Sequence, residues 1–314
     1  LVVTGARDVR LGTALAQGGG RAAGRRLLDH QLQVWRQAGI LDKYIAPERL
    51  LVYELLAGHV DKVAAAMDTD LLDWRRAFGL YHWFQLSPKA GLQDVLRRYE
   101  SAHQRQVAPA PAPHYEELAV GPSRVFARRR LDITYHLLCL AAGHASDLCL
   151  MDGAGDIDDA DEERRWRVMF APPTYSADPL EHALGWHLQG AVAAISMEPW
   201  TGESMQQRAA LRAQLHCAMA SQLELVGGMC EWAVFAAMHL EDASAREALV
   251  TELLSRHCEE WSASEAKQAF LRDRLQVPAR LLEATMAQLA YYRLDWEAEF
   301  LHRCAAGAGH WTRA

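Results

Sequence analysis

The sequence predicts an all-α protein. Ala and Leu dominate its 314 residues, half of which are apolar, whereas Ile and Thr are scarce and alternating apolar and polar runs are nearly absent. Strong helix formers without strand formers indicate helices throughout. No repeat with a period of roughly 34 or 40 residues is visible. A large helical bundle, an all-α enzyme and an irregular solenoid of stacked helix pairs therefore stay open.

Charge, hydropathy and cysteine spacing exclude several classes. A formal net charge of −7 argues against a nucleic-acid surface, which needs an excess of clustered Lys and Arg. No apolar run reaches the roughly 18 residues of a membrane span. The 6 cysteines are scattered without a C-x-x-C pair. They are expected to be free thiols buried as small apolar residues in a reducing compartment, not a disulfide frame or a zinc site.

The first third of the chain reads as a series of helices. One is predicted at 25–37, with its leucines on one face, and a second at 46–57, with Pro47 in its first turn. The stretch 71–84 follows with five aromatic residues. Trp74 lies on its more aromatic side, and because an aromatic stripe at helical spacing is usually core, it is expected to anchor the packing.

Two breaks interrupt the helices. Four prolines make 107–125 an extended linker or surface loop, after which a helix resumes at 131–142. The second break, 151–165, is an acidic run. Its residues Asp158, Asp159 and Glu162 loosely resemble the magnesium-binding carboxylates of all-α terpene synthases. They sit beside glycines and lack a second half-site, so a solvated acidic loop is the favoured interpretation and no metal ligand is assigned.

The centre of the chain is predicted to be a long, well-covered helix. Asp178 is expected to cap it, with Pro179 at its first position and Glu181 completing a capping box. Leucines then recur every four residues, and Trp186 is expected to be mostly buried, touching residues before 107 or after 230 as well as sequence neighbours.

The histidines next to this tryptophan do not form a metal motif. His182 and His187 are five residues apart and so lie on different helix faces. Neither a His-Glu-x-x-His nor a Gly-x-Ser-x-Gly motif is present. No catalytic, cofactor or metal-binding residue is therefore predicted.

Six stretches together resemble one family. They are Leu71–Trp83, Leu131–Leu138, Ala177–Leu188, Cys230–Leu240 with Arg246–Cys258, Val277–Arg280 and Ala308–Arg313. The family is the scaffold nucleoporin made as the C-terminal half of the nucleoporin 98–96 precursor, a subunit of the Y-shaped outer-ring complex of the nuclear pore. Trp232, in the fourth stretch, is expected to be a structural anchor like Trp74, Asp178, Pro179 and Trp186.

The resemblance implies a folded-back α-solenoid with trunk, crown and tail. It divides the chain into outgoing helices with part of the crown (1–106), a Pro-rich linker (107–125), a crown helix (126–150), an acidic loop (151–165), returning trunk helices (166–260) and the start of a tail (261–314).

The implied function is that of a non-catalytic scaffold in the nuclear envelope, supporting transport of protein and mRNA. Its implied partners are the other outer-ring (Y complex) nucleoporins and the β-propeller shared with the COPII coat. The family binds this propeller through an extra blade near the N-terminus, which is expected to be absent from this fragment because no strand-rich segment precedes Leu1. The alternatives are a related vesicle-coat solenoid and, less favoured, a metal-dependent all-α enzyme.

Overall fold

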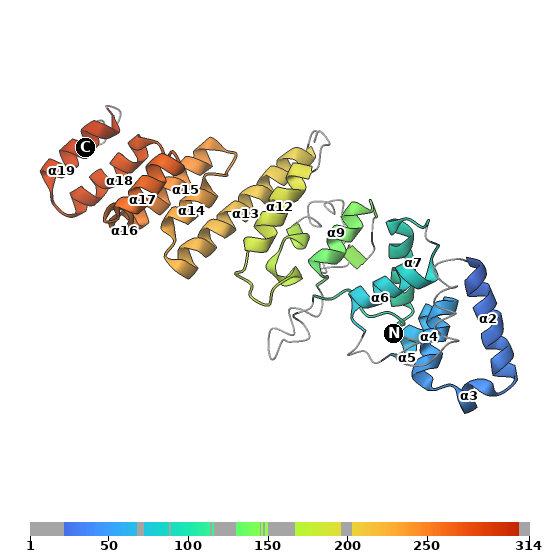
Figure 1. The fold of residues 1–314 in the computed structure, drawn as a ribbon. Helices are drawn as coiled ribbons and strands as arrows, with labels where there is room; N and C mark the ends of the chain where they lie inside the picture. The colour runs from blue at the N-terminus through green and yellow to red at the C-terminus, as the bar shows by residue number, and fades with distance from the viewer. Residues whose placement is uncertain are drawn as a thin grey trace. The chain divides into compact units, whose positions relative to one another are not determined.

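The computed structural model describes residues 22–67, 72–87, 89–113, 115, 130–144, 146, 148–149, 167–195 and 203–307 (Figure 1). These residues are mostly helical and contain no strand, which confirms the predicted all-α class. The chain forms two compact units, Leu1–Asp156 and Ile157–Ala314. No described helix combines the length and the apolar content needed to cross a bilayer.

The first unit is a sequence of short helices. They are α2 (Ala22–Gln37), α3 (Ile40–Tyr44), α4 (Pro47–Ala57), α5 (Val60–Ala66), α6 (Trp74–Leu80), the π-helix η1 (Tyr81–Gln85), α7 (Leu92–Gln104) and α9 (Ile133–Ala141). Helix α4 begins at Pro47 as predicted and ends before Gly58, whose φ of 93° is the left-handed conformation that glycine adopts without strain. Helix α2 packs on α3 and α4, and η1 packs on α4, α5, α6 and α7.

Aromatic rings fill the core of this unit. Three fully buried tyrosines contact one another or Trp74 and Phe78 through tilted or edge-to-face ring pairs. Each hydroxyl still finds an acceptor, as a buried O–H must: Tyr81 donates to Asp61 (2.9 Å), Tyr99 to the Pro109 carbonyl (2.5 Å) and Tyr135 to Glu100 (2.6 Å). The sequence predicted this aromatic stripe correctly.

The chain after α7 differs from its prediction. Residues 107–113 are irregular, as their three prolines require, but they are not a surface loop. Ala108 is buried, and the Pro109 and Pro111 carbonyls accept hydrogen bonds from Tyr99 and the Asp132 backbone. These contacts hold the segment against the aromatic core. Most of 114–129 and all of the acidic run 151–165 lie outside the described residues.

The described elements of the second unit are also all helices. It contains the 3₁₀ turn η3 (Pro172–Thr174), α12 (Ala183–Ile195), α13 (Glu203–Gly227), α14 (Cys230–Ala237), α15 (Ala243–Arg256), α16 (Cys258–Ser262), α17 (Glu265–Ala269), the π-helix η4 (Phe270–Arg274), α18 (Ala279–Tyr292) and α19 (Trp296–Ala306). Neighbouring helices pack in chain order from α12 to α15, and α15 then packs on α18 and α18 on α19. This order is compatible with a solenoid, while the division into trunk, crown and tail stays a prediction.

Small residues fill the centre of this unit. Ala233, Ala236 and Ala237 of α14 are almost completely buried and belong to the same core cluster as Leu253 and Leu254 of α15. Because these alanines project little beyond the backbone, the helices can pack closely without a void.

All six cysteines are free. Four of them are buried as predicted, namely Cys139, Cys149, Cys230 and Cys258. Cys217 and Cys304 are exposed, so for these two the prediction was wrong; each lies on the outer side of its helix.

Candidate functional site

Trp74 is a buried anchor of the first unit. Its side chain is 5% exposed and meets Tyr135 edge to face, with ring centroids 5.7 Å apart. The indole N–H points at Asp132 Oδ2 (3.3 Å), which also receives a hydrogen bond from Arg75 (2.6 Å). Asp132 additionally caps α9 by accepting from the Thr134 backbone (2.7 Å). Trp74 thus links α6 to the start of α9.

The central helix begins later than predicted. Asp178 and Pro179 lie in a turn, and α12 starts at Ala183. Asp178 accepts from the Leu180 backbone (2.9 Å), which closes the turn, while Glu181 caps the helix by accepting from the Ala183 backbone (2.7 Å). Both carboxylates could cap a helix, and the one nearer to the apolar run does so.

A close packing contact explains why α12 starts there. Gly185 is the buried residue of α12, and a Cβ at this position would collide with the carbonyl of Phe170. The Tyr175 hydroxyl donates to the Glu181 carbonyl (2.7 Å) and accepts from the Gly185 backbone (3.2 Å). Burial raises the pKa of Tyr175 to about 12, so the hydroxyl keeps its proton for this role. The segment that contains Phe170 and Tyr175 therefore packs closely on the first turn of α12 and is hydrogen-bonded to it.

Trp186 is partly buried and belongs to a ring cluster of the second unit. Its indole N–H donates to His216 Nδ1 (2.8 Å), and its ring meets Phe235 and His239 edge to face. The predicted contacts after residue 230 are thus present, although the ring is less covered than predicted. Burial lowers the pKa of His216 to about 4, with smaller contributions from His239 and Arg212. His216 is therefore neutral at pH 7, so its Nδ1 can accept the hydrogen bond from the Trp186 indole N–H.

Trp232, the remaining predicted anchor, is 44% exposed. Its ring packs on Phe270 of η4 (centroids 5.0 Å apart) and Phe235 (5.8 Å). It covers the outer side of the junction between α14 and η4 and does not enter the core. Trp261 of α16 holds the buried position instead: it is 3% exposed and donates to the Leu254 carbonyl (2.8 Å).

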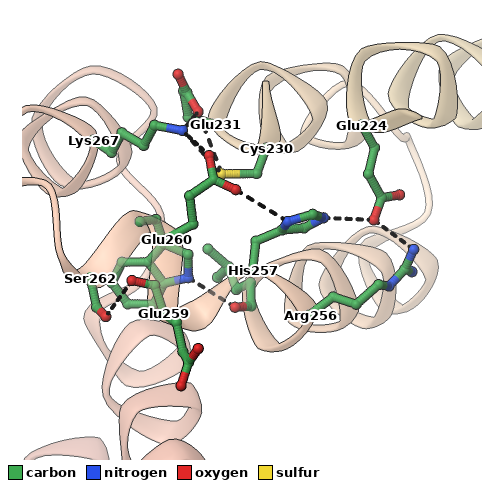
Figure 2. Close-up of polar contacts among 11 residues, drawn as sticks. Glu224, Cys230, Glu231, Arg256, His257, Glu259, Glu260, Ser262 and Lys267 are labelled. Atoms are coloured by element: carbon green, nitrogen blue, oxygen red, sulfur yellow. Dashed lines mark hydrogen bonds and ion pairs between the residues drawn. The ribbon is translucent and has the colours of Figure 1, made fainter. Parts of the chain in front are cut away.

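A polar cluster of the second unit surrounds Lys267 of α17 (Figure 2). The Lys267 ammonium contacts Glu231 (3.0 Å), Glu260 and the Cys230 sulfur (3.8 Å). These three acceptors come from α14 and α16, so one lysine joins three helices. The hydrogen bond to Glu260 is the main reason why the pKa of Lys267 is raised above its usual value.

A second polar group continues from this cluster. His257 contacts Glu260 (3.4 Å) through Nδ1 and Glu224 of α13 (2.8 Å) through Nε2 (Figure 2). Arg256 also binds Glu224 (2.6 Å), whose side chain is 10% exposed. The Lys267 cluster and this group together tie α13, α14, α15, α16 and α17 to one another.

Cys230, Glu231 and Glu260 are arranged as the ligands of a metal ion could be, but the Lys267 ammonium already contacts all three. Ligand atoms of Cys230, Glu231 and Glu260 lie within 4.8 Å of one another, close enough to bind one ion. The Lys267 ammonium already supplies the positive charge, however, and burial raises the pKa of Cys230 to about 11, so the thiol stays protonated at neutral pH. A metal would need the thiolate and would have to displace the lysine. The cluster is therefore an interhelical link.

The two histidines considered in the sequence lie elsewhere in the second unit. His182 and His187 lie near the start of α12, where the His182 backbone donates to Gln222 (2.6 Å) and the His187 ring packs on Trp186. Asp158, Asp159 and Glu162 lie outside the described residues.

Comparison with known proteins decides the family. The family model described as nuclear protein 96 (Nup96) matches residues 2–289. The chain belongs to the Nup96 family. It is 27% identical over 293 residues to the Arabidopsis thaliana nuclear pore complex protein NUP96, covering 92% of this chain and 25% of that relative. It is also 27% identical over 278 residues to the Drosophila melanogaster nuclear pore complex protein Nup98-Nup96, covering 86% of this chain and 13% of the relative.

A more distant relative is nucleoporin nup189 of Schizosaccharomyces pombe, 24% identical over 302 residues. This chain spans 25% or less of each of these three relatives. The Nup96 match includes all five predicted anchors and the Lys267 cluster, but it ends at Leu289, before α19 begins.

Proposed function

We propose that this chain is a non-catalytic scaffold segment of the nuclear pore complex, located at the nuclear envelope and supporting transport of protein and mRNA. The observation that carries the proposal is the Nup96 match over residues 2–289. The relatives are nuclear pore complex proteins by name. Helices packed in chain order present long side surfaces, which suits a protein whose work is to hold others.

The partners proposed are the other nucleoporins of the Y-shaped outer-ring complex and the β-propeller shared with the COPII coat. These follow from the family and not from a contact in the structure. The Nup96 match favours this assignment over the related vesicle coats, which share the helical architecture but belong to other families.

The chemistry of the described residues supports a non-catalytic role. The polar groups that come together, such as Lys267 with Glu231 and Glu260, satisfy one another and join helices. An enzyme needs a pocket in which polar groups converge on a substrate.

The test of the proposal is copurification from nuclear envelopes. The tagged protein is expected to colocalise with nuclear pores and to bring down outer-ring subunits in fixed proportion. A matched variant, Ala236→Leu in the core of the second unit, is expected to lose part of this association because packing around α14 is disturbed. Diffuse staining together with no outer-ring subunit in the eluate would contradict the proposal.

The metal-dependent alternative has its own test. Millimolar magnesium is expected to leave the melting temperature unchanged, since a ligand that binds the folded state raises it by mass action. A rise of several degrees that Asp158→Ala with Asp159→Ala abolishes would establish a metal site in the acidic run.

A further inference from the structure

Two buried cysteines of the first unit are hydrogen-bonded to each other. Cys139 lies in α9 and is 2% exposed, Cys149 is 4% exposed, and both belong to the core cluster that contains Trp74. The Cys139 thiol donates its hydrogen bond to the Cys149 sulfur. A disulfide forms only where two cysteines can bring their sulfur atoms together without a large movement of the backbone. The pair therefore meets the first requirement for a disulfide.

The end of α9 explains how the chain brings the two residues together. The helix is followed by Gly143, whose φ of 59° is the left-handed conformation common at a helix C-terminus. The His144 N–H then donates to the Cys139 carbonyl (2.9 Å), which closes the turn. Beyond it the fully buried Ser146 contacts the Tyr135 hydroxyl (3.3 Å), near the start of α9. The chain thus folds back along the helix that it has just left.

The surroundings of the two thiols differ, and the difference assigns their roles. The hydrogen bond from Cys139 is the main reason why the pKa of Cys149 is lowered to about 5, and hydrogen bonds with His136 and Ser146 add to it against the effect of burial. The same hydrogen bond, together with burial, raises the pKa of Cys139. Because the thiolate is the reactive form of cysteine, Cys149 is the nucleophile of the pair and Cys139 keeps its proton.

A metal ion fits this pair less well than a disulfide does. A structural zinc site takes four ligands, so two more would have to join the two sulfur atoms. Among the residues that the structure describes, neither cysteine belongs to a group of three potential metal ligands. The described residues therefore support the chemistry of a dithiol.

We propose that Cys139 and Cys149 form a redox modification site, which hydrogen peroxide converts reversibly into a disulfide. The Cys149 thiolate attacks one peroxide oxygen; the O–O bond breaks, an S–O bond forms, and the other oxygen takes up a proton and leaves as water. The Cys139 sulfur then attacks the sulfenic acid of Cys149; the S–S bond forms, the S–O bond breaks, and the hydroxyl group leaves as water with the Cys139 proton. The two thiols lose two electrons and one peroxide gains them. A dithiol such as dithiothreitol reverses the reaction.

Burial determines which oxidant this site takes. Hydrogen peroxide is hardly larger than water, whereas an aromatic disulfide reagent such as 5,5′-dithiobis(2-nitrobenzoic acid) needs an exposed sulfur. Cys217 and Cys304 are exposed and so provide controls within the same chain. The aromatic reagent is expected to label these two and to spare Cys139 and Cys149, while peroxide is expected to oxidise the buried pair first.

Peptide mass spectrometry of the full chain tests the proposal. The reduced protein is treated with increasing hydrogen peroxide, blocked with N-ethylmaleimide and digested with trypsin, which leaves both cysteines in one peptide, 131–164. After oxidation this peptide is expected to carry no maleimide and to weigh two hydrogen atoms less than the dithiol. Dithiothreitol before blocking is expected to restore two maleimide groups.

A matched pair of variants tests the roles of the two thiols. Cys139→Ser keeps a hydroxyl that can donate to Cys149 but removes the second thiol, so the sulfenic acid is expected to persist and to be trapped by dimedone. The trapping is expected to be about tenfold faster than at Cys217. In Cys149→Ser the remaining Cys139 is expected to react no faster than Cys217. Thermal melts by circular dichroism check that both variants are folded.

Two results would overturn the proposal. One is the absence of the disulfide at peroxide concentrations that oxidise Cys217 and Cys304 of the wild-type chain, or its formation only in urea, and this result does not depend on how the variants fold. The other is equal dimedone labelling of the two variants. The proposed pore function would survive either result, because it is tested by copurification and not by thiol chemistry.

Discussion

The cores of the two units differ in the side chains that fill them. In the first unit Tyr81, Tyr99 and Tyr135 are fully buried and their hydroxyls end on acceptors at the edge of the core. In the second unit the buried cluster contains one aromatic ring, Trp261, and consists mainly of the alanines of α14 and aliphatic residues of the neighbouring helices. A few large rings hold the first core together, whereas close helix approach holds the second. The two units are therefore sensitive to opposite kinds of substitution.

The ion pairs that join helices also differ between the two units, in how far they are exposed to water. In the first unit two covered carboxylates join helices: Glu54, which is buried, binds Arg36 (2.7 Å), and Asp61, which is half-buried, binds Arg98 (2.8 Å) and the Tyr81 hydroxyl. In the second unit many links lie near the surface, such as the bidentate pair of Glu247 with Arg280. Exposed ion pairs contribute less because water screens them. Loss of one link is expected to matter more in the first unit.

The largest expected effect is removal of a ring from the first core. Tyr99→Ala removes a fully buried ring that contacts Phe78, Tyr81 and Tyr135, and is expected to cost about 3–5 kcal/mol. Tyr292→Ala, at a position that is 72% exposed, is the control and is expected to change the free energy of unfolding by no more than about 0.5 kcal/mol. Urea denaturation measures both. Equal effects would mean that the aromatic core does not carry the stability of the first unit.

Enlarging a residue of the second core comes next. Ala236→Leu adds volume where α14 is completely buried, and is expected to cost about 1–3 kcal/mol through overpacking. Ala305→Leu makes the same change at an exposed position of α19 and serves as the control, with an expected effect within about 0.5 kcal/mol. If Ala236→Leu is tolerated as well as Ala305→Leu, the helices around α14 are not closely packed.

A pH effect is expected in the second unit. The folded pKa of His216 is about 4, below its usual 6.5, so as the pH falls from 6.5 to 4 the unfolded state takes up the proton first. Stability is thus present above pH 6.5, lost progressively down to pH 4 and flat below. After allowance for partial exposure, we expect a loss on the order of 1–2 kcal/mol.

The control for this pH effect is His216→Gln, which keeps an acceptor for Trp186 and cannot titrate. The difference between the two proteins in unfolding free energy at pH 7 and pH 4.5 measures the effect. An identical slope in both would show that His216 is not the responsible group.

The smallest expected effects concern the two carboxylates that precede α12, Asp178 and Glu181. Glu181→Ala removes the acceptor for the Ala183 N–H and the contact to Gln222 (3.3 Å), and is expected to cost about 1 kcal/mol. Asp178→Ala removes only a hydrogen bond of an exposed turn, so a change within about 0.5 kcal/mol is expected. If Asp178→Ala lowers the melting temperature more than Glu181→Ala does, then Asp178 and not Glu181 caps the helix.

Sequence alone was sufficient for the class and for several helices of the first unit. Pro47 and Gly58 bound α4 because proline suits a first turn and glycine adopts the left-handed conformation at the helix end. The aromatic spacing around Trp74 correctly predicted the core of the first unit. These are local signals, readable within one or two helical turns.

The remaining features depend on distant contacts. Asp178 and Glu181 are both good caps in sequence, and the choice between them is made by Tyr175 and Phe170 packing on Gly185. The Lys267 cluster joins residues up to 37 positions apart, and no sequence motif with a fixed spacing predicts it. Trp232 and Trp261 are alike in sequence, and only the position of α16 and η4 determines that Trp261 is the buried one.

The glycine in α12 has a consequence for how this sequence can diverge. At 27% identity to its relatives, the chain has exchanged most of its side chains for others. Position 185 has little such freedom: any side chain would meet the Phe170 carbonyl, a backbone atom that cannot turn aside as a side chain would. A residue larger than glycine could be accommodated at position 185 only if the segment 167–176 moved as a whole. A glycine at position 185 is therefore expected wherever the segment 167–176 keeps this close approach to α12.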